Sequence, residues 1–225
     1  MARGVATTSR ARYTTQRSMT AESPLTFRCG PLSLEGAAAI PAGAAHAVVV
    51  CHPHPEYGGT MDDGIVTTVA RRLAAAGIAT LRFNFRGVGR SEGRHGGGTA
   101  EIDDVRAALD ALAERAPAAR LALAGYSFGA AVAVRAALGD TRPRCVAAIA
   151  LPTAMLDAGF LDGCRTPALL VQGDRDQFSP LAQLDALVAR CPGPTQVVRI
   201  PGADHFLYPA ADRVGEHVVR FVTEA

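Results

Sequence analysis

The sequence has no lysine: all 23 basic residues are arginines, set against 21 acidic residues for a formal net charge of +2. We interpret this absence as coding bias rather than chemistry. Outside the N-terminal stretch the arginines are scattered, whereas nucleic-acid-binding proteins gather their positive charge in patches or stripes. The charge pattern therefore predicts no nucleic-acid partner.

Long apolar runs and paired cysteines are also missing. No apolar run approaches the roughly 20 residues of a membrane-spanning helix, so we expect no membrane insertion. The five cysteines are odd in number and lack the paired spacing of a disulfide framework or a zinc ribbon. This pattern favours a reducing, cytoplasmic setting.

A length of 225 residues, 48% of them hydrophobic, suits one globular domain with a full core. Residues 1–20 are rich in Arg, Ser, Thr and Ala and contain no acid. Their composition is similar to that of a transit peptide, but the apolar core of a secretion signal is missing. We favour a disordered tail, or a functional start at Met19, before a single domain at residues 21–225.

Strand-like and helix-like patterns alternate along this domain. Short apolar runs predict strands at residues 25–29, 32–36, 47–51, 78–85, 121–124, 146–151, 168–172 and 196–200. Helical patterns occupy residues 60–76, 103–115, 130–138, 180–190 and 210–222, with Thr60 and Asp63 as a candidate capping box. This alternation predicts an α/β fold with a mostly parallel central sheet and helices on both faces.

The stretch Gly125-Tyr126-Ser127-Phe128-Gly129 joins a predicted strand to a predicted helix. A strand that turns sharply into a helix strains its apex residue and crowds the flanking positions, where glycine relieves the contacts. The apex Ser127 would stand clear of the sheet, and the first NH groups of the helix would be free to bind an anion. This context predicts a nucleophile elbow with Ser127 as the nucleophile.

A serine nucleophile needs a base, and the base needs a carboxylate that fixes its tautomer. In open parallel sheets such groups gather at the carboxyl ends of strands. Asp174 and Asp176 follow the strand predicted at residues 168–172. His205 follows the strand predicted at residues 196–200. The order Ser, Asp, His along the chain is the order that α/β-hydrolases use.

From residue 25 onward the chain resembles the α/β-hydrolase superfamily, and more closely its small cap-less bacterial members with an HPHP loop, which are related to dienelactone hydrolase. The matching motifs are HPHPEYGGTM at residues 52–61, FNFRGVGRS at 83–91, the elbow, and the segments 173–180 and 202–206. The resemblance implies an α/β-hydrolase fold without a cap domain, no cofactor, and a catalytic triad of Ser127, Asp176 and His205. Dienelactone hydrolase itself has cysteine at the elbow, so the serine here argues against a dienelactone substrate.

In the G-x-x-D loops of this superfamily the third residue after the glycine orients the histidine, which selects Asp176. Asp174 is then a turn residue that bonds nearby backbone NH groups. The alternative, in which Asp174 orients the histidine, stays open at this point.

The superfamily draws its second oxyanion donor from the loop that here contains HPHP. Pro53 and Pro55 have no NH, so only His54 offers a backbone donor between them. We therefore expect an oxyanion to bind the NH groups of His54 and Phe128, because preset donors stabilise the charge that develops in acyl transfer.

The pair His52 and His54 also invites a metal interpretation. Metal-dependent hydrolases follow H-x-H closely with Asp-His, whereas this chain continues with Pro55, Glu56 and Tyr57. We therefore expect no metal site. The other histidines, His46, His95 and His217, have no partnering context and are expected at the surface.

The predicted function is a serine hydrolase of the carboxylesterase type that acts on small acyl substrates, as a monomer or a homodimer. Two alternatives stay open: acyl transfer to an acceptor other than water, as in a perhydrolase, and ligand binding without catalysis. Residues 152–167 are too few for a lid, because two packed helices and their turns need roughly 25 residues. An open pocket favours short acyl chains.

Overall fold

The computed structural model describes residues 21–225, and the tail and alternative start predicted within residues 1–20 lie outside the described residues. The described strands form one eight-stranded sheet in the spatial order β1-β2-β4-β3-β5-β6-β7-β8. The strands are β1 (Ser23–Cys29), β2 (Leu32–Ala39), β3 (His46–Cys51), β4 (Ala79–Phe83), β5 (Arg120–Tyr126), β6 (Val146–Ile149), β7 (Ala168–Gly173) and β8 (Thr195–Ile200). β2 pairs antiparallel with β1 and β4, and every other pair is parallel. The sheet is therefore mostly parallel, as predicted.

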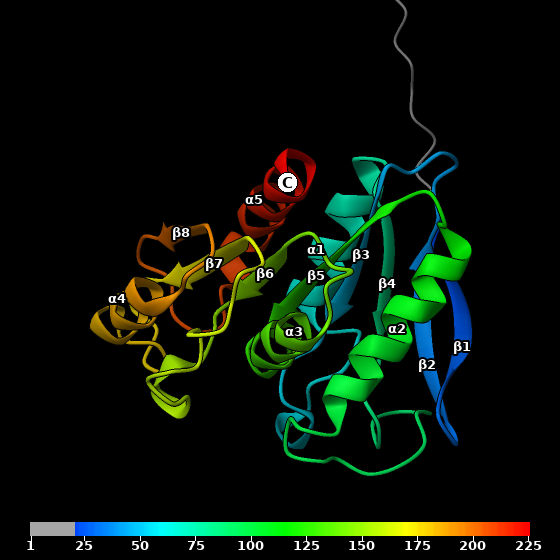
Figure 1. Ribbon diagram of the computed structural model, residues 1–225, viewed down its shortest axis with the longest axis horizontal. Helices are drawn as coiled ribbons and strands as arrows, with labels where there is room; N and C mark the ends of the chain where they lie inside the picture. The colour runs from blue at the N-terminus through cyan, green and yellow to red at the C-terminus, as the bar shows by residue number, and fades with distance from the viewer. Residues whose placement is uncertain (1–20) are drawn as a thin grey trace, which may run out of the picture.

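Helices cover both faces of this sheet (Figure 1). They are α1 (Gly64–Ala75), α2 (Glu101–Arg115), α3 (Phe128–Gly139), α4 (Leu181–Arg190) and α5 (Ala211–Glu224). α2, α3 and α4 contribute to one core cluster, and α1 and α5 contribute to the cluster on the other face. Because both faces are covered, Val48, Val49 and Val50 of the central strand β3 are all buried.

No cap domain lies over the sheet in the described part of the chain. Residues 150–167, which connect β6 to β7, contain a single turn of 3-10 helix, η2 (Thr153–Met155). Its length predicted too little helix for a lid, and the segment contains only this one turn. Among the helices at residues 21–225, none is long and apolar enough to cross a lipid bilayer.

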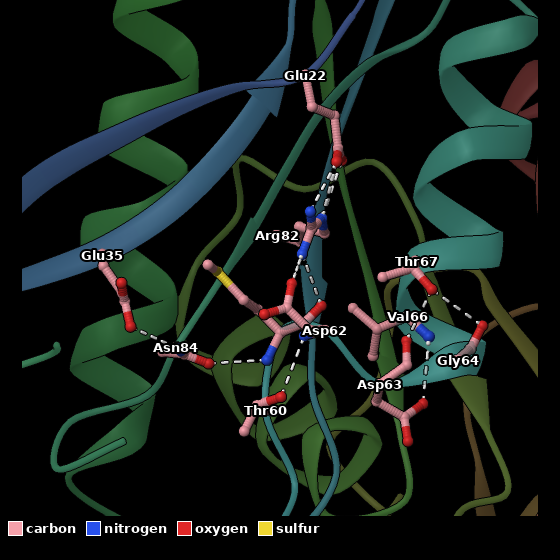
Figure 2. A network of polar contacts seen from close by, with 11 residues as sticks. Glu22, Glu35, Thr60, Asp62, Asp63, Gly64, Val66, Thr67, Arg82 and Asn84 are labelled. Atoms are coloured by element: carbon pink, nitrogen blue, oxygen red, sulfur yellow. Dashed lines mark hydrogen bonds and ion pairs between the residues drawn. The ribbon is translucent and has the colours of Figure 1, made fainter. Parts of the chain in front are cut away.

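The start of α1 differs from the prediction. Asp63, rather than Thr60, caps the helix: its Oδ1 accepts hydrogen bonds from the NH groups of Ile65 at 2.8 Å and Val66 at 3.4 Å. Figure 2 shows the contact with Val66. Thr60 Oγ1 instead accepts from the NH of Asp62 at 3.2 Å. Because an aspartate next to the first turn satisfies two helix donors at once, the helix begins one turn later than predicted.

A polar network holds the segment before α1 against the sheet (Figure 2). Arg82 on β4 donates from Nη2 to Glu22 at 2.8 Å and from Nη1 to the Met61 carbonyl at 3.0 Å, and it forms an ion pair with Asp62. Asn84 Oδ1 accepts from the NH of Met61 at 2.7 Å. The segment continues directly from the HPHP loop, so the network fixes the route of the chain at this end of the sheet.

A buried ion pair fixes the segment between β4 and α2. The backbone NH of Arg86 donates to Asp104 Oδ2 at 3.0 Å, and Nη2 of the same arginine donates to Oδ1 at 2.7 Å. Asp104 lies on α2 and is fully buried. Removing either partner would leave an uncompensated charge in the interior, so the pair holds this segment firmly.

Candidate active site

Ser127 lies at the turn between β5 and α3. Its backbone has φ 55° and ψ −116°, a positive-φ conformation that costs a non-glycine residue about 1–3 kcal/mol. The NH of Ser127 donates to the Ile149 carbonyl of β6 at 2.8 Å, so the sheet holds the strained residue in place. The strand, sharp turn and helix predicted for a nucleophile elbow are therefore present.

The two glycines of the elbow allow backbones to approach closely. A Cβ at Gly129 would lie 2.4 Å from the carbonyl oxygen of His52 and 2.5 Å from that of Cys51. A Cβ at Gly125 would lie 2.2 Å from the carbonyl oxygen of Gly129. Any larger residue would push α3 away from the end of β3, because backbone atoms cannot give way as a flexible side chain can.

Two consecutive polar contacts join Ser127 to His205 and His205 to Asp176. Ser127 Oγ lies 2.9 Å from His205 Nε2, and His205 Nδ1 lies 2.8 Å from Asp176 Oδ2. The three residues follow β5, β8 and β7, so the shared carboxyl edge of a parallel sheet brings them together. With the proton of the neutral imidazole on Nδ1, facing the carboxylate, Nε2 can accept a proton from the serine.

The two candidate acids differ in burial and contacts. Asp174 is exposed, and its Oδ1 accepts from the NH of Gly202 at 2.7 Å. Asp176 is only 5% exposed, and its Oδ1 accepts from the NH of Phe178 at 2.8 Å while Oδ2 faces His205. Asp176, and not Asp174, therefore lies against the imidazole.

Two polar residues that the sequence analysis did not single out support this arrangement. Gln172, fully buried at the end of β7, donates from Nε2 to Asp176 Oδ2, the oxygen that also faces His205. The hydroxyl of Tyr126 donates to the His205 carbonyl at 3.2 Å. The available signal for Gln172 was a single polar residue at the end of an apolar strand.

The two residues predicted to donate to an oxyanion are neighbours. The ring centroids of His54 and Phe128 are 4.8 Å apart. Phe128 is the first residue of α3, where an NH has no partner within the helix. Neither of the two NH groups donates a hydrogen bond to another atom within residues 21–225. Both are available to a ligand, and their oxyanion role stays a prediction.

His52 belongs to the interior of the molecule. Its Nδ1 donates to the Pro53 carbonyl at 2.6 Å, and its Nε2 accepts from the NH of Phe85 at 3.1 Å. Burial lowers the pKa of His52 to about 4, so the imidazole is neutral near pH 7. Both ring nitrogens are engaged, and His52 therefore has none left with which to join His54 in binding a metal ion.

We expected His95 to lie free at the surface, but the structure places it elsewhere. Its side chain is only 19% exposed, and Nδ1 lies 3.0 Å from Glu101 Oε1, although without the alignment of a full hydrogen bond. Its ring centroid is 5.1 Å from that of His54 and 5.4 Å from that of Phe128. The expectation was wrong because the segment between β4 and α2 packs against the HPHP loop, a contact that no local sequence pattern reveals.

The mostly parallel eight-stranded sheet, the elbow serine and the absence of a cap among the described residues together define a cap-less α/β serine hydrolase. The family model described as serine aminopeptidase, S33 matches residues 43–160, a little over half of the chain. The chain therefore belongs to this hydrolase family.

Solved structures and a curated relative are similar to the chain. An α/β serine hydrolase homologue from Coxiella burnetii is 34% identical with a TM-score of 0.80, covering 88% of this chain and 96% of that one. A serine hydrolase without a lid from Xanthomonas campestris is 31% identical with a TM-score of 0.79, covering 91% and 95%. An uncharacterized protein of Rickettsia prowazekii is 35% identical over 171 residues, 72% of each chain. The closer likeness to dienelactone hydrolase stays a prediction.

Proposed function

We propose that the protein cleaves small carboxylic esters, or related acyl bonds, with Ser127 as nucleophile, His205 as general base and acid, and Asp176 as the orienting carboxylate. The observation that carries the proposal is the continuous pair of contacts, 2.9 Å from serine to histidine and 2.8 Å from histidine to aspartate. A serine hydroxyl is a weak nucleophile until a base takes its proton, and an imidazole held by a buried carboxylate is such a base.

The reaction proceeds through an acyl-enzyme. His205 Nε2 takes the proton of Ser127 as Oγ attacks the carbonyl carbon of the substrate. The tetrahedral intermediate collapses, the ester C–O bond breaks, and His205 returns the proton to the leaving alcohol. Water then attacks the acyl group with the same base, which releases the carboxylic acid and restores the serine. Asp176 keeps its charge throughout and stabilises the imidazolium.

The negative charge of the tetrahedral intermediate binds the NH groups of His54 and Phe128. The NH of Phe128 lies at the N-terminus of α3, where the helix dipole adds to the attraction for an anion. Removal of one such donor typically costs a hydrolase roughly 10²–10³ in kcat. These two donors are therefore expected to supply a large part of the rate enhancement.

Substrates are small because no cap covers the site within residues 21–225. The segment between β6 and β7 adds only η2, and the side chains of Met155, Phe206 and Tyr208 are 66%, 48% and 53% exposed. An acyl chain gains about 0.8 kcal/mol for each methylene only where that methylene is buried. In an open site the binding free energy therefore stops improving at a short acyl-chain length.

Replacement of the nucleophile tests the proposal. Ser127→Ala should lower kcat by roughly 10⁴ or more and abolish labelling by a fluorophosphonate probe, while the fold survives. Ser179→Ala removes another buried hydroxyl, which contacts Thr153, and should leave labelling intact. Near-normal turnover by purified Ser127→Ala would reject the nucleophile.

A substrate panel separates the alternatives. It should contain esters, thioesters and lactones, and also amino-acid amides because the matching family is described by an aminopeptidase. Preferential product formation with added peroxide or alcohol would indicate acyl transfer rather than hydrolysis. Failure of both labelling and turnover would indicate a binding protein on a hydrolase fold.

A further inference from the structure

A cluster of metal-ligating side chains lies beside the site and takes no part in the proposed hydrolysis. It consists of His54, Glu56 and His95, and one ligand atom of each lies within 4.8 Å of the other two. We propose that this cluster binds a divalent transition-metal ion of the zinc class, and that the bound ion inhibits the enzyme.

The two imidazoles come from separate segments and each has one ring nitrogen unused. His54 lies in the HPHP loop after β3, and its Nδ1 accepts from the NH of Glu56 at 3.2 Å. His95 lies between β4 and α2, and its Nδ1 faces Glu101 at 3.0 Å. This contact leaves Nε2 of His95 for an ion. A neutral His54 ring that accepts at Nδ1 carries its proton on Nε2, so an ion binds this ring only when the Glu56 NH contact is given up, either at Nδ1 itself or at Nε2 after the proton has moved to Nδ1. Two imidazole nitrogens and a carboxylate form one of the ligand sets that zinc enzymes use.

Glu101 supplies the outer partner that a ligating histidine usually has. It is fully buried at the start of α2, and its Oε1 and Oε2 accept from the NH groups of Gly96 at 2.6 Å and Gly98 at 2.8 Å. These bonds fix the carboxylate behind His95. A carboxylate in that position can accept the Nδ1 hydrogen bond that orients a ligating imidazole, once the His95 ring turns to align with it.

The three ligand atoms must move only slightly closer together to bind an ion. Ligand atoms about 2.0–2.1 Å from a tetrahedral zinc ion lie roughly 3.4 Å from one another, so a separation of up to 4.8 Å must shorten. Glu56 is exposed, and its side chain can rotate inward without moving the core. Pro53 and Pro55 restrain the backbone on either side of His54, so little loop entropy is lost on binding.

Inhibition follows from the position of His54. Its NH is the proposed oxyanion donor, and its ring contacts Phe128. An ion held by the His54 ring would fix this loop in the metal-bound geometry, so that the His54 NH could no longer adjust to the oxyanion. This consequence rests on the proposed function, whereas binding of the ion does not.

Binding is measured on tag-free, metal-stripped, full-length protein. Calorimetric titration with Zn²⁺ and visible absorption of bound Co²⁺ should show one ion per chain. Loss of an outer partner typically weakens a metal about 10–100-fold, so loss of a direct ligand in His95→Gln or Glu56→Gln should weaken Zn²⁺ by at least that factor. His217→Ala removes a histidine outside the cluster and should bind as the wild type does.

The outcomes separate the two parts of the proposal. Ser127→Ala should bind Zn²⁺ normally, so metal binding survives even if the hydrolase assignment fails. Absence of one-to-one binding, or unchanged affinity in Glu56→Gln, whose exposed side chain is dispensable for folding, would overturn the site. In activity assays Zn²⁺ should inhibit the wild type but not Glu56→Gln, and a chelator should preserve full activity. Loss of activity on chelation, or activity unchanged in the zinc-saturated wild type, would overturn the inhibitory role.

Discussion

Asp174 and Asp176 are two residues apart, yet their surroundings give them different tasks. Asp176 is buried against His205, so Asp176→Asn should lower kcat by roughly 10³–10⁴ because the imidazole loses its oriented tautomer. Asp174 bonds the NH of Gly202 at an exposed turn, so Asp174→Asn should cost about 1 kcal/mol of stability and little turnover. Steady-state kinetics and thermal melts distinguish the two. A larger kinetic defect in Asp174→Asn at unchanged Tm would reverse the roles.

His52 makes the stability of the fold depend on pH. Burial lowers its pKa to about 4, whereas an unfolded chain has a histidine pKa of about 6.5. Between these values the unfolded state binds a proton that the folded state does not. The free energy of unfolding therefore falls as the pH drops from about 6.5 to about 4, by roughly 3 kcal/mol in all, and the full stabilisation is present above that window.

Urea unfolding of the wild type and of His52→Asn, from about pH 7 to about pH 4, measures this contribution. His46, His54 and His217 also have lowered pKa values, mainly through burial, and they remain in the variant. The difference between the two pH slopes is therefore the contribution of His52. Equal slopes would show that its proton affinity is the same in the folded and unfolded states.

At the scale of the element, the strands and the elbow were predictable because each is marked by a local pattern. β5 and β7 are apolar runs that end just before Ser127 and Asp176, and His205 follows the end of β8. The start of α1 was less predictable because Thr60 and Asp63 are both capable caps. The helix begins after Asp63, where Arg82 on β4 holds the preceding segment.

Side chains whose partners are distant in sequence were not predictable in this way. The packing of His95 against His54 depends on the path of the segment between β4 and α2. That path is held by the buried pair of Arg86 and Asp104, and the sequence offers several acids as partners for this arginine. Gln172 was missed because its contact with Asp176 depends on a side-chain rotamer and not on a spacing.

The elbow tolerates little added volume. In Gly129→Ala the new methyl group would lie within 2.5 Å of two carbonyl oxygens of β3 and the residue after it. Overpacking of this kind costs about 1–3 kcal/mol, and displacement of α3 should also lower kcat by moving the Phe128 NH.

Gly163→Ala is the matched control, because the added methyl would meet no atom closer than 3.7 Å. Thermal melts and ester hydrolysis of the two variants would then be compared. Similar stability and turnover in both would show that α3 does not require a close approach to β3.

At the scale of the whole molecule, the lack of a cap leads us to expect small substrates. We expect kcat/KM on nitrophenyl esters to peak at acyl chains of about two to six carbons, because longer chains extend into water and gain nothing. Micelles should bring no interfacial activation. A profile that rises steadily to long-chain esters would instead require a buried acyl tunnel.

Among the described strands, β8 occupies one edge of the sheet and pairs only with β7, and most of its residues are at least partly exposed. Edge elements with few buried contacts are among the first to open in native-state fluctuations, well below the free energy of global unfolding. His205, the proposed base, is carried on the loop that follows β8, so each such opening would withdraw it while the central strands stay paired. Amide hydrogens of β8 should therefore exchange faster than those of β5, and activity should vanish at lower urea than the far-ultraviolet signal. Coincident midpoints would mean that β8 and the centre of the sheet form one cooperative unit.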